Sequence, residues 1–273
     1  MTTFCNKNLV VANYRSKISK IENKNIQYLK TNIKFSDNNF PNDIDAIIHS
    51  AAVTPFTTNN EIDYLTNNIK YLDNILNWVI RTNVKKIVFL SSMSVYGERP
   101  EDIIYETTIP KNISPYGVSK IKAEKIIINK LQNKNIRYLI LRLPGVLGLN
   151  SPKTFIPKVI DIIKNNKYPE IFVNNKRSLF NNIISVQQLY NFMNLWLNNS
   201  NKSHLLNLGS SESIRHDKLI EIISNFYSKK TVITEDNKVK KSYLINFDLA
   251  IKNGYIPQSV SDTIYEYLNV KKN

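Results

Sequence analysis

The feature that most constrains this fold is an alternation of short apolar runs with longer segments of helical periodicity. The run KKIVFLSS at residues 85–92 is typical of a buried strand, and residues 60–82 carry apolar side chains at helical spacing. Ser114 and Pro115 suit the N-cap and first position of another helix, and a strand is expected at 136–148. Strands that alternate with helices in this way indicate βαβ units, so we expect an α/β fold with a doubly wound parallel sheet.

The rhythm of the chain changes after about residue 150, where short strands and helices no longer alternate regularly. We therefore expect a doubly wound domain over residues 1–150 and a smaller substrate-binding lobe over residues 151–273. The other predicted strands cover residues 8–14, 25–29, 43–52 and 170–173, and the other predicted helices lie near 155–165, 186–198, 215–227 and 260–268.

The composition argues against several classes of protein. Cys5 is the only cysteine, which rules out an internal disulfide, and the three histidines lack metal-ligand spacing. No apolar run approaches the roughly 18 residues needed to span a bilayer. The first residues, MTTFCNKN, do not resemble a secretory signal. We therefore expect a cytoplasmic protein that holds no metal and does not enter a membrane.

The chain is strongly basic, with 37 Lys and Arg against 22 Asp and Glu and a formal net charge of +15. These basic residues are spread along the sequence, and no block of five or six like charges occurs. Nucleic acid is therefore not the expected partner, although steep salt dependence of binding would reveal one. A basic surface suits a small substrate that carries phosphate.

Tyr116 and Lys120, in the stretch SPYGVSK, are four residues apart at the start of a predicted helix, so both project from one face. A neighbouring ammonium stabilises a phenolate, which lowers the pKa of tyrosine from about 10. The preceding strand ends at Ser92, and strand ends and following helix starts face the ligand crevice of a doubly wound sheet. The three side chains can therefore act together on a carbonyl or an alcohol. A second pair with this spacing, Tyr267 and Lys271, lies near the C-terminus without such a setting.

Several motifs occur in the order and spacing of one known family. By these motifs the chain resembles an extended short-chain dehydrogenase/reductase of the NAD-dependent epimerase/dehydratase family, which acts on nucleotide sugars. The resemblance runs from about residue 8 to the end and implies a Rossmann-like fold. The motifs are DIDAIIHSAA at 43–52, NNIKYLDNIL at 67–76, FLSSMSVYG at 89–97, YGVSK at 116–120, LRLPGVLG at 141–148, LFNNIISVQQL at 179–189 and LLNLGSSE at 205–212.

The resemblance implies a role for each candidate catalytic residue. Tyr116 would be the acid/base that moves a proton on a sugar hydroxyl. Lys120 would hold the nicotinamide ribose and tune Tyr116, and Ser92 would orient the sugar oxygen. The activity implied is that of a nucleotide-sugar epimerase or ketosugar reductase serving surface polysaccharide synthesis.

The resemblance also implies a cofactor, NAD or NADP, and a nucleotide-sugar substrate. Arg15 lies where the family discriminates between the two cofactors, and an arginine there favours NADP. Asn68 would support a strand end, although an ordinary surface asparagine is the alternative. Arg177 would contact the diphosphate, with a solvated loop charge as the alternative. The full set of implied binding residues is Arg15, Asn32, Ile33, Ala51, Ala52 and Asn68 for the cofactor, and Met93, Ser94 and Arg177 for the substrate.

Part of the family pattern is not found in this sequence. The family's first strand, its Gly-x-x-Gly-x-x-Gly turn and its first helix should precede the strand at 8–14, yet the first glycine is Gly97. A glycine turn lets the backbone approach a pyrophosphate, and a helix start adds the positive end of its dipole. We therefore expect weak or lost cofactor binding by this chain, either as a truncated gene product or with another element in the gap.

Other departures bear on the type of reaction. Dehydratases of the family carry an acidic pair where this sequence has Met93 and Ser94, which predicts epimerisation or reduction without dehydration. The acidic pair of the C-terminal lobe is replaced by Gln187 and Gln188, and the asparagine that follows LR in the family is replaced by Gly145. The alternative to an enzyme is a non-catalytic remnant or binding protein of the same fold. The family's usual dimer implies a homodimer through helices 60–82 and 116–131.

Overall fold

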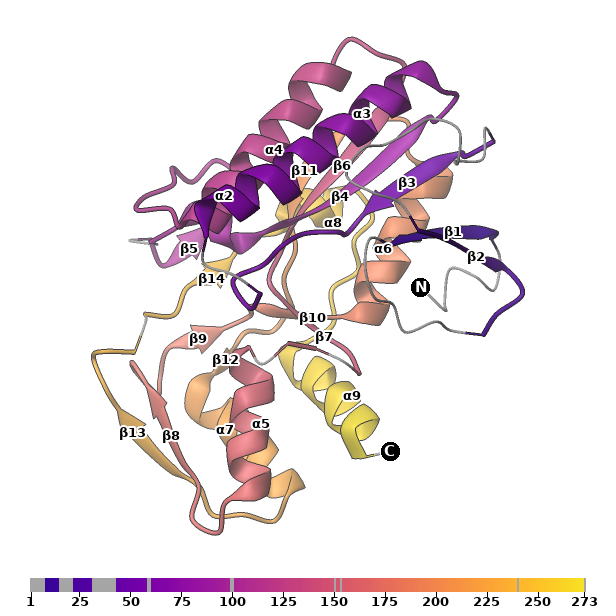
Figure 1. Ribbon diagram of the computed structural model, residues 1–273. Helices are drawn as coiled ribbons and strands as arrows, with labels where there is room; N and C mark the ends of the chain where they lie inside the picture. Colours follow the sequence, from indigo (N-terminus) through magenta and orange to yellow (C-terminus); the bar gives the residue numbers. More distant parts are fainter. Residues whose placement is uncertain are drawn as a thin grey trace. The chain divides into compact units, whose positions relative to one another are not determined.

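The chain forms two compact units, which are described separately below (Figure 1). The first unit comprises Met1–Val95, Ile113–Leu141 and Met193–Leu205, and the second comprises Tyr96–Asn112, Arg142–Phe192 and Leu206–Asn273. The units interleave along the sequence, and the assignment of a cofactor-binding domain to residues 1–150 and a substrate-binding lobe to residues 151–273 stays a prediction. The computed structural model describes residues 8–14, 22–30, 43–57, 60–98, 101–149, 151–152, 154–239 and 241–272.

A four-stranded sheet with the order β11-β6-β4-β3 organises the first unit. Strands β3 and β4 pair in parallel, from Ala46 opposite Lys86 to His49 opposite Phe89. This parallel pairing is the one expected from the alternation of strands and helices. The four strands are β3 (Ala46–His49), β4 (Lys86–Ser92), β6 (Arg137–Leu143) and β11 (His204–Asn207).

Strands β1 (Val10–Tyr14) and β2 (Ile26–Lys30) pair in parallel with each other and form a sheet of their own. In the four-stranded sheet of the first unit, β3 is the last strand in the order. Among the described residues, therefore, no strand pairs with the outer edge of β3.

Helices of the first unit cover the sheet through an apolar core. Figure 1 shows α3 (Tyr71–Arg81) and α4 (Pro115–Leu131) side by side. Ser114 caps α4, since its hydroxyl accepts from the Gly117 N–H at 3.2 Å, and Pro115 occupies the first turn as predicted. The core that these helices share with the strands contains Leu72, Ile75, Leu76, Val79, Ile87, Phe89, Ala123, Ile127, Leu131 and Ile140.

The helix predicted at 60–82 is not uniform. It begins as α2 (Glu61–Asp63), continues as the π-helical segment η2 (Tyr64–Lys70) and ends as α3. In a π-helical turn the backbone hydrogen bonds join residues five apart and not four, and such turns are frequent at functional sites. Tyr64 and Asn68, both buried, belong to this segment.

The second unit packs helices against short paired strands. Its core joins side chains of α5 and α7 with those of α9 and of the strands. The helices are α5 (Phe155–Asn165), α7 (His216–Phe226), α8 (Asp248–Lys252) and α9 (Val260–Lys272), and α6 (Val186–Asn199) extends into the first unit. The strand pairs are β5 (Ile103–Ile104) with β14 (Leu244–Ile245), β7 (Gly145–Leu147) with β10 (Ile183–Ser185), β8 (Glu170–Val173) with β13 (Val232–Glu235), and β9 (Leu179–Phe180) with β12 (Ile214–Arg215).

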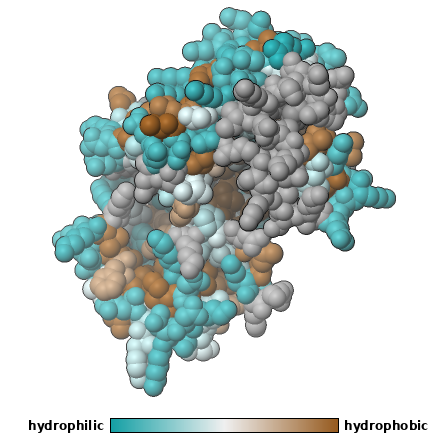
Figure 2. Space-filling view, in the orientation of Figure 1, coloured by the Kyte–Doolittle hydropathy of each residue, from teal (hydrophilic) through white to brown (hydrophobic). Residues whose placement is uncertain are grey.

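The visible surface of the described residues is mainly hydrophilic, with apolar residues scattered between polar ones (Figure 2). None of the helices in the described part of the chain combines the length and the apolar character needed to cross a bilayer.

Candidate active site

The end of β4 and the start of α4 bring the predicted catalytic side chains together. The Tyr116 side chain forms a hydrogen bond with Ser92 and lies edge-on to the Tyr64 ring, with the ring centroids 5.7 Å apart. Gly117 permits the close approach of α4 to the 3-10 turn Met93–Tyr96 that follows β4. A Cβ on Gly117 would lie 2.2 Å from the Ser94 carbonyl oxygen, far inside any ordinary contact.

Lys120 lies one helical turn beyond Tyr116 and is only 4% exposed. Its ammonium donates to the backbone carbonyl of Leu90 at 2.8 Å. The same nitrogen lies 4.7 Å from the ring centroid of Phe89 and 5.8 Å from that of Tyr116. The hydroxyl, phenol and ammonium expected from the sequence are therefore neighbours within the first unit.

Burial controls the titration of these groups. It raises the pKa of the Tyr116 phenol above its ordinary value, while the hydrogen bond to Ser92 acts in the opposite direction. Burial also lowers the pKa of Lys120 from 10.5 to about 8, against the favourable charge of Glu124. The sequence predicted that Lys120 would lower the pKa of Tyr116. The net direction here is the opposite, because desolvation of the phenol outweighs the other effects and the Leu90 carbonyl binds the ammonium.

Asn68 fastens the chain segment that follows β3. Its Oδ1 accepts from the Val53 N–H at 2.7 Å, and its Nδ2 donates to the Val53 carbonyl at 3.1 Å. Nδ2 also lies 3.4 Å from the Ser119 hydroxyl, which in turn donates to the Tyr116 carbonyl at 2.8 Å. Because Asn68 is 5% exposed, the alternative of an ordinary surface asparagine is wrong. Its part in cofactor binding stays a prediction.

The segment between β3 and Val53 contains Ala51, which is exposed, and Ala52, which is half-buried. His49, at the end of β3, is buried and stacks on Phe89 with the ring centroids 5.7 Å apart. Burial, and secondarily the charge of Lys120, lowers the pKa of His49 to about 3. His49 is therefore a neutral side chain at physiological pH.

The remaining predicted residues of the first unit differ in what can be described. Arg15, Asn32 and Ile33 lie outside the described residues. Met93 is buried, and Ser94 is half-buried with its backbone N–H donating to the Ser92 hydroxyl at 3.1 Å. This hydrogen bond from Ser94 orients the Ser92 hydroxyl. The predicted substrate contacts of Met93 and Ser94 stay untested.

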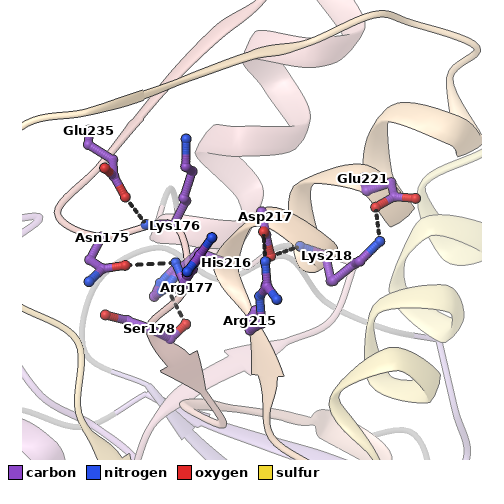
Figure 3. A network of polar contacts seen from close by, with 10 residues as sticks. All are labelled: Asn175, Lys176, Arg177, Ser178, Arg215, His216, Asp217, Lys218, Glu221 and Glu235. Carbon is purple, nitrogen blue, oxygen red and sulfur yellow. Dashed lines mark hydrogen bonds and ion pairs between the residues drawn. The ribbon is translucent and has the colours of Figure 1, made fainter.

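Arg177 belongs to the second unit, on an exposed turn before β9. Figure 3 shows this turn within a network of polar contacts. The Arg177 N–H donates to Asn175 Oδ1 at 2.8 Å, and the Lys176 N–H donates to Glu235 Oε1 at 2.9 Å. These bonds fix the backbone of the turn. The predicted contact of the Arg177 guanidinium with a diphosphate stays a prediction.

Arg215 and Lys218 of this network each pair with a carboxylate, and His216 contacts a backbone carbonyl. His216 Nδ1 lies 3.0 Å from the Ser178 carbonyl, Arg215 pairs with Asp217, and Lys218 lies 2.7 Å from Glu221 (Figure 3). Among the described residues, no group of three or more His, Cys, Asp or Glu side chains could hold a metal ion.

Gln188, one of two glutamines in place of an acidic pair, has a structural partner in the second unit. Its Oε1 accepts from the Ser185 N–H at 2.7 Å, and the Ser185 hydroxyl accepts from the Gln188 N–H at 3.1 Å. This reciprocal pair is a capping box at the start of α6, and the spacing S-x-x-Q before an apolar run is its sequence signal.

A family model matches residues 8–209 of the chain, and its description is NAD dependent epimerase/dehydratase family. The chain belongs to this family. The parallel sheet, the tyrosine and lysine at the start of α4, and the serine at the end of β4 are thus seen here in a family member. The α/β, Rossmann-like fold expected from the sequence is confirmed.

Several curated members of the family are similar over part of their length. The chain is 34% identical over 116 residues to the probable UDP-arabinose 4-epimerase 3 of Arabidopsis thaliana, covering 42% of this chain and 27% of that protein. It is 30% identical over 194 residues to the putative UDP-glucose 4-epimerase of Methanocaldococcus jannaschii, covering 67% of this chain and 61% of that protein. The match therefore spans only about a quarter of the length of the first of these relatives.

Solved structures of the family share the fold. The UDP-N-acetylglucosamine 4-epimerase of Methanobrevibacter ruminantium M1 superposes with a TM-score of 0.82 at 23% identity, covering 98% of this chain and 92% of that one. The UDP-glucuronic acid 4-epimerase of Bacillus cereus superposes with a TM-score of 0.75 at 22% identity, covering 92% and 82%. At these identities the similarity shows the fold alone.

The sequence did not predict several residues that line the candidate active site. Tyr64 and Ser119 contact Tyr116, and Ser91 and Glu124 form a buried pair beside Lys120. Glu124 had a usable signal, since it lies four residues after Lys120 on the same helical face. Ser91 and Tyr64 had none, because their partners are distant in the sequence.

Proposed function

We propose that this protein is a nucleotide-sugar epimerase that uses NAD and in which Tyr116 is the acid/base. The observation that carries the proposal is the hydrogen bond between Tyr116 and Ser92 with the Lys120 ammonium beside it, in a chain of this family. The relatives and structural neighbours support the substrate class, since they are named as 4-epimerases of UDP-sugars.

The chemistry of the site follows from the three side chains. Tyr116 removes the proton of a sugar hydroxyl and returns it after the sugar has rotated within the site. Ser92 holds the same oxygen by a hydrogen bond. A raised phenol pKa makes Tyr116 a strong proton acceptor once ionised, and the nearby Lys120 ammonium supplies the charge that favours ionisation when substrate displaces water. NAD, when bound, accepts and returns the hydride of the sugar.

The residues around β3 are compatible with NAD. Ala51 and Ala52 present small side chains on a segment that Asn68 holds by both backbone groups of Val53, and small side chains suit a segment that a phosphate would approach. Lys120 would hold the nicotinamide ribose. A neighbour solved in complex with NAD favours this cofactor, whereas Arg15 keeps NADP as the second candidate. We infer that binding by these 273 residues is weak, because they include no glycine before Gly97.

The test is the incubation of the purified protein with NAD and single UDP-sugars, namely UDP-glucose, UDP-arabinose and UDP-glucuronic acid, followed by NMR identification of the products. We expect a 4-epimer to form without net NADH production, since an epimerase returns the hydride it takes. In a parallel incubation with NADPH and a UDP-keto-sugar, stoichiometric consumption of NADPH would establish the reductase instead. A 4-keto-6-deoxy product would overturn the assignment of Met93 and Ser94.

A chain that turned over none of these sugars, even with excess NAD, would favour the non-catalytic remnant or binding protein. Two broader proposals accompany the epimerase. Its product would supply surface polysaccharide synthesis, because nucleotide sugars are glycosyl donors. The protein would form a homodimer through the helical segment 60–82, which comprises α2, η2 and α3, and the helix at 116–131, which is α4. Light scattering on the purified chain would test this.

A further inference from the structure

Ser91 and Glu124 form a buried polar pair immediately beside the candidate active site. The Ser91 hydroxyl donates to Glu124 Oε1 at 2.5 Å. Ser91 is 4% exposed and Glu124 is 3% exposed, so the carboxylate lies deep within the first unit. Burying a carboxylate is unfavourable unless it is paired or hydrogen-bonded, so this placement calls for a physical reason.

Three consecutive residues of β4 are bonded to three successive turns of α4. The carbonyl of Leu90 accepts from Lys120, Ser91 donates to Glu124, and Ser92 is bonded to Tyr116. Ser91 therefore lies between the two residues that hold the candidate catalytic groups. A shift of α4 along β4 would lengthen all three bonds, so the Ser91–Glu124 bond opposes a change in the register of Tyr116 against Ser92.

Glu124 lies one turn after Lys120 in the same helix, and its charge acts on the Lys120 ammonium. Its charge favours the protonated lysine, against the desolvation that lowers the pKa of Lys120. The other titratable groups around Lys120 are His49 on β3, which is neutral, and Tyr116 itself. Glu124 is thus the acidic group among those that interact with Lys120 in the described part of the chain.

We propose that Glu124 is a positioning residue of this site: held by Ser91, its carboxylate keeps Lys120 protonated and keeps α4 in register with β4. The buried side chain accepts from Ser91 and acts through Lys120. The proposal rests on the proposed function only for the use of Lys120 there. The test of this positioning role does not require turnover. Absence of epimerase activity would therefore contradict the proposed function without contradicting this inference.

The experiment is a pH titration of Lys120 by NMR of protein labelled with 13C at the lysine Cε, with its signal identified by its absence in Lys120→Arg. In the parent we expect one lysine to titrate near pH 8, well below the surface lysines. In Glu124→Gln, which keeps shape and hydrogen bonding, we expect the midpoint to fall by about one unit or more. The control Glu221→Gln removes an exposed carboxylate beside Lys218 and should leave the Lys120 midpoint unchanged.

A second variant separates positioning from simple packing. Ser91→Ala with Glu124→Met replaces both members by apolar groups, a change that often leaves a fold as stable as before. If the pair served packing alone, this double variant would keep the Lys120 midpoint of the parent, and that result would overturn the proposal. We expect a cooperative thermal melt together with a midpoint lowered as in Glu124→Gln. If only one of the two variants, Glu124→Gln or the double variant, folds, an unchanged Lys120 titration midpoint in that variant contradicts the inference.

Discussion

Lys120 and Leu90 are joined by a hydrogen bond of 2.8 Å from a buried ammonium to a strand carbonyl. A single neutral acceptor only partly replaces the water that the ammonium loses on burial. The pKa of Lys120 is therefore lowered to about 8, and the charge that the proposed mechanism requires is also one that weakens the fold.

The first prediction concerns stability and pH. The folded pKa of Lys120 is about 8 and the unfolded value is 10.5, so between these values the unfolded chain binds the proton more tightly. Stability from this group therefore rises with pH across that window, and below pH 8 the buried charge costs about 3 kcal/mol. Lys120→Met should gain most over the parent at pH 7 and progressively less towards pH 10.5, as measured by urea unfolding. The exposed Lys125→Met should show no such dependence.

The second prediction concerns Tyr116. In the turnover assay described above, Tyr116→Phe should lower kcat by roughly 10²- to 10⁴-fold, the usual contribution of a general acid/base. The substitution removes the hydroxyl that bonds Ser92 and keeps the ring that contacts Tyr64. Tyr267→Phe is the matched control, because it deletes the same group in the second unit. Equal rates for Tyr116→Phe and the parent would refute the assignment.

The third prediction concerns two buried tyrosines of the second unit. Tyr267 is 3% exposed and its hydroxyl has no hydrogen-bond partner among the residues that the structure describes. Tyr267→Phe therefore removes an unpaired polar group and should stabilise the chain, by up to about 1 kcal/mol. The hydroxyl of Tyr255 donates to the Gly209 carbonyl at 2.8 Å, so Tyr255→Phe should destabilise it by about 1–2 kcal/mol. Thermal or urea unfolding of the two variants would reveal opposite signs, and a common sign would contradict the assignment of their partners.

The fourth prediction concerns Asn68. Asn68→Ala deletes both bonds to the Val53 backbone and should destabilise the first unit by about 1–2 kcal/mol, because half-buried backbone groups lose their partner. Amide hydrogen exchange at Val53 should accelerate in the same variant. Asn198→Ala, which removes an exposed asparagine bonded to Asn194, should have little effect on either measurement. Unchanged exchange at Val53 would show that another group secures this segment.

The fifth prediction concerns the cofactor. Isothermal titration of these 273 residues with NAD(H) and NADP(H) should show binding weaker than micromolar, because no glycine turn in the sequence lets backbone N–H groups approach a pyrophosphate closely. Lys120→Met should weaken any residual binding further, since it deletes the proposed contact to the ribose. Micromolar binding by the parent would show that another element supplies those contacts.

The sequence alone predicted the elements that depend on local patterns. Helix α4 begins at Pro115 after the Ser114 cap, and β4 occupies the apolar run before Ser92, both where spacing and capping placed them. Patterns of two and 3.6 residues report which side of an element is buried, and this requires no knowledge of its neighbours. The motif around Tyr116 and Lys120 was found for the same reason, since its residues share one helical turn.

Only the tertiary structure decided what those residues touch and how they titrate. The bond from Lys120 to Leu90, the attachment of Asn68 to Val53 and the pair of Ser91 with Glu124 each join residues at least 15 positions apart. The direction of the Tyr116 pKa was predicted incorrectly, because the desolvation that raises it comes from the whole surrounding fold. Long-range packing and the loss of solvent are collective properties, and no local pattern in the sequence records them.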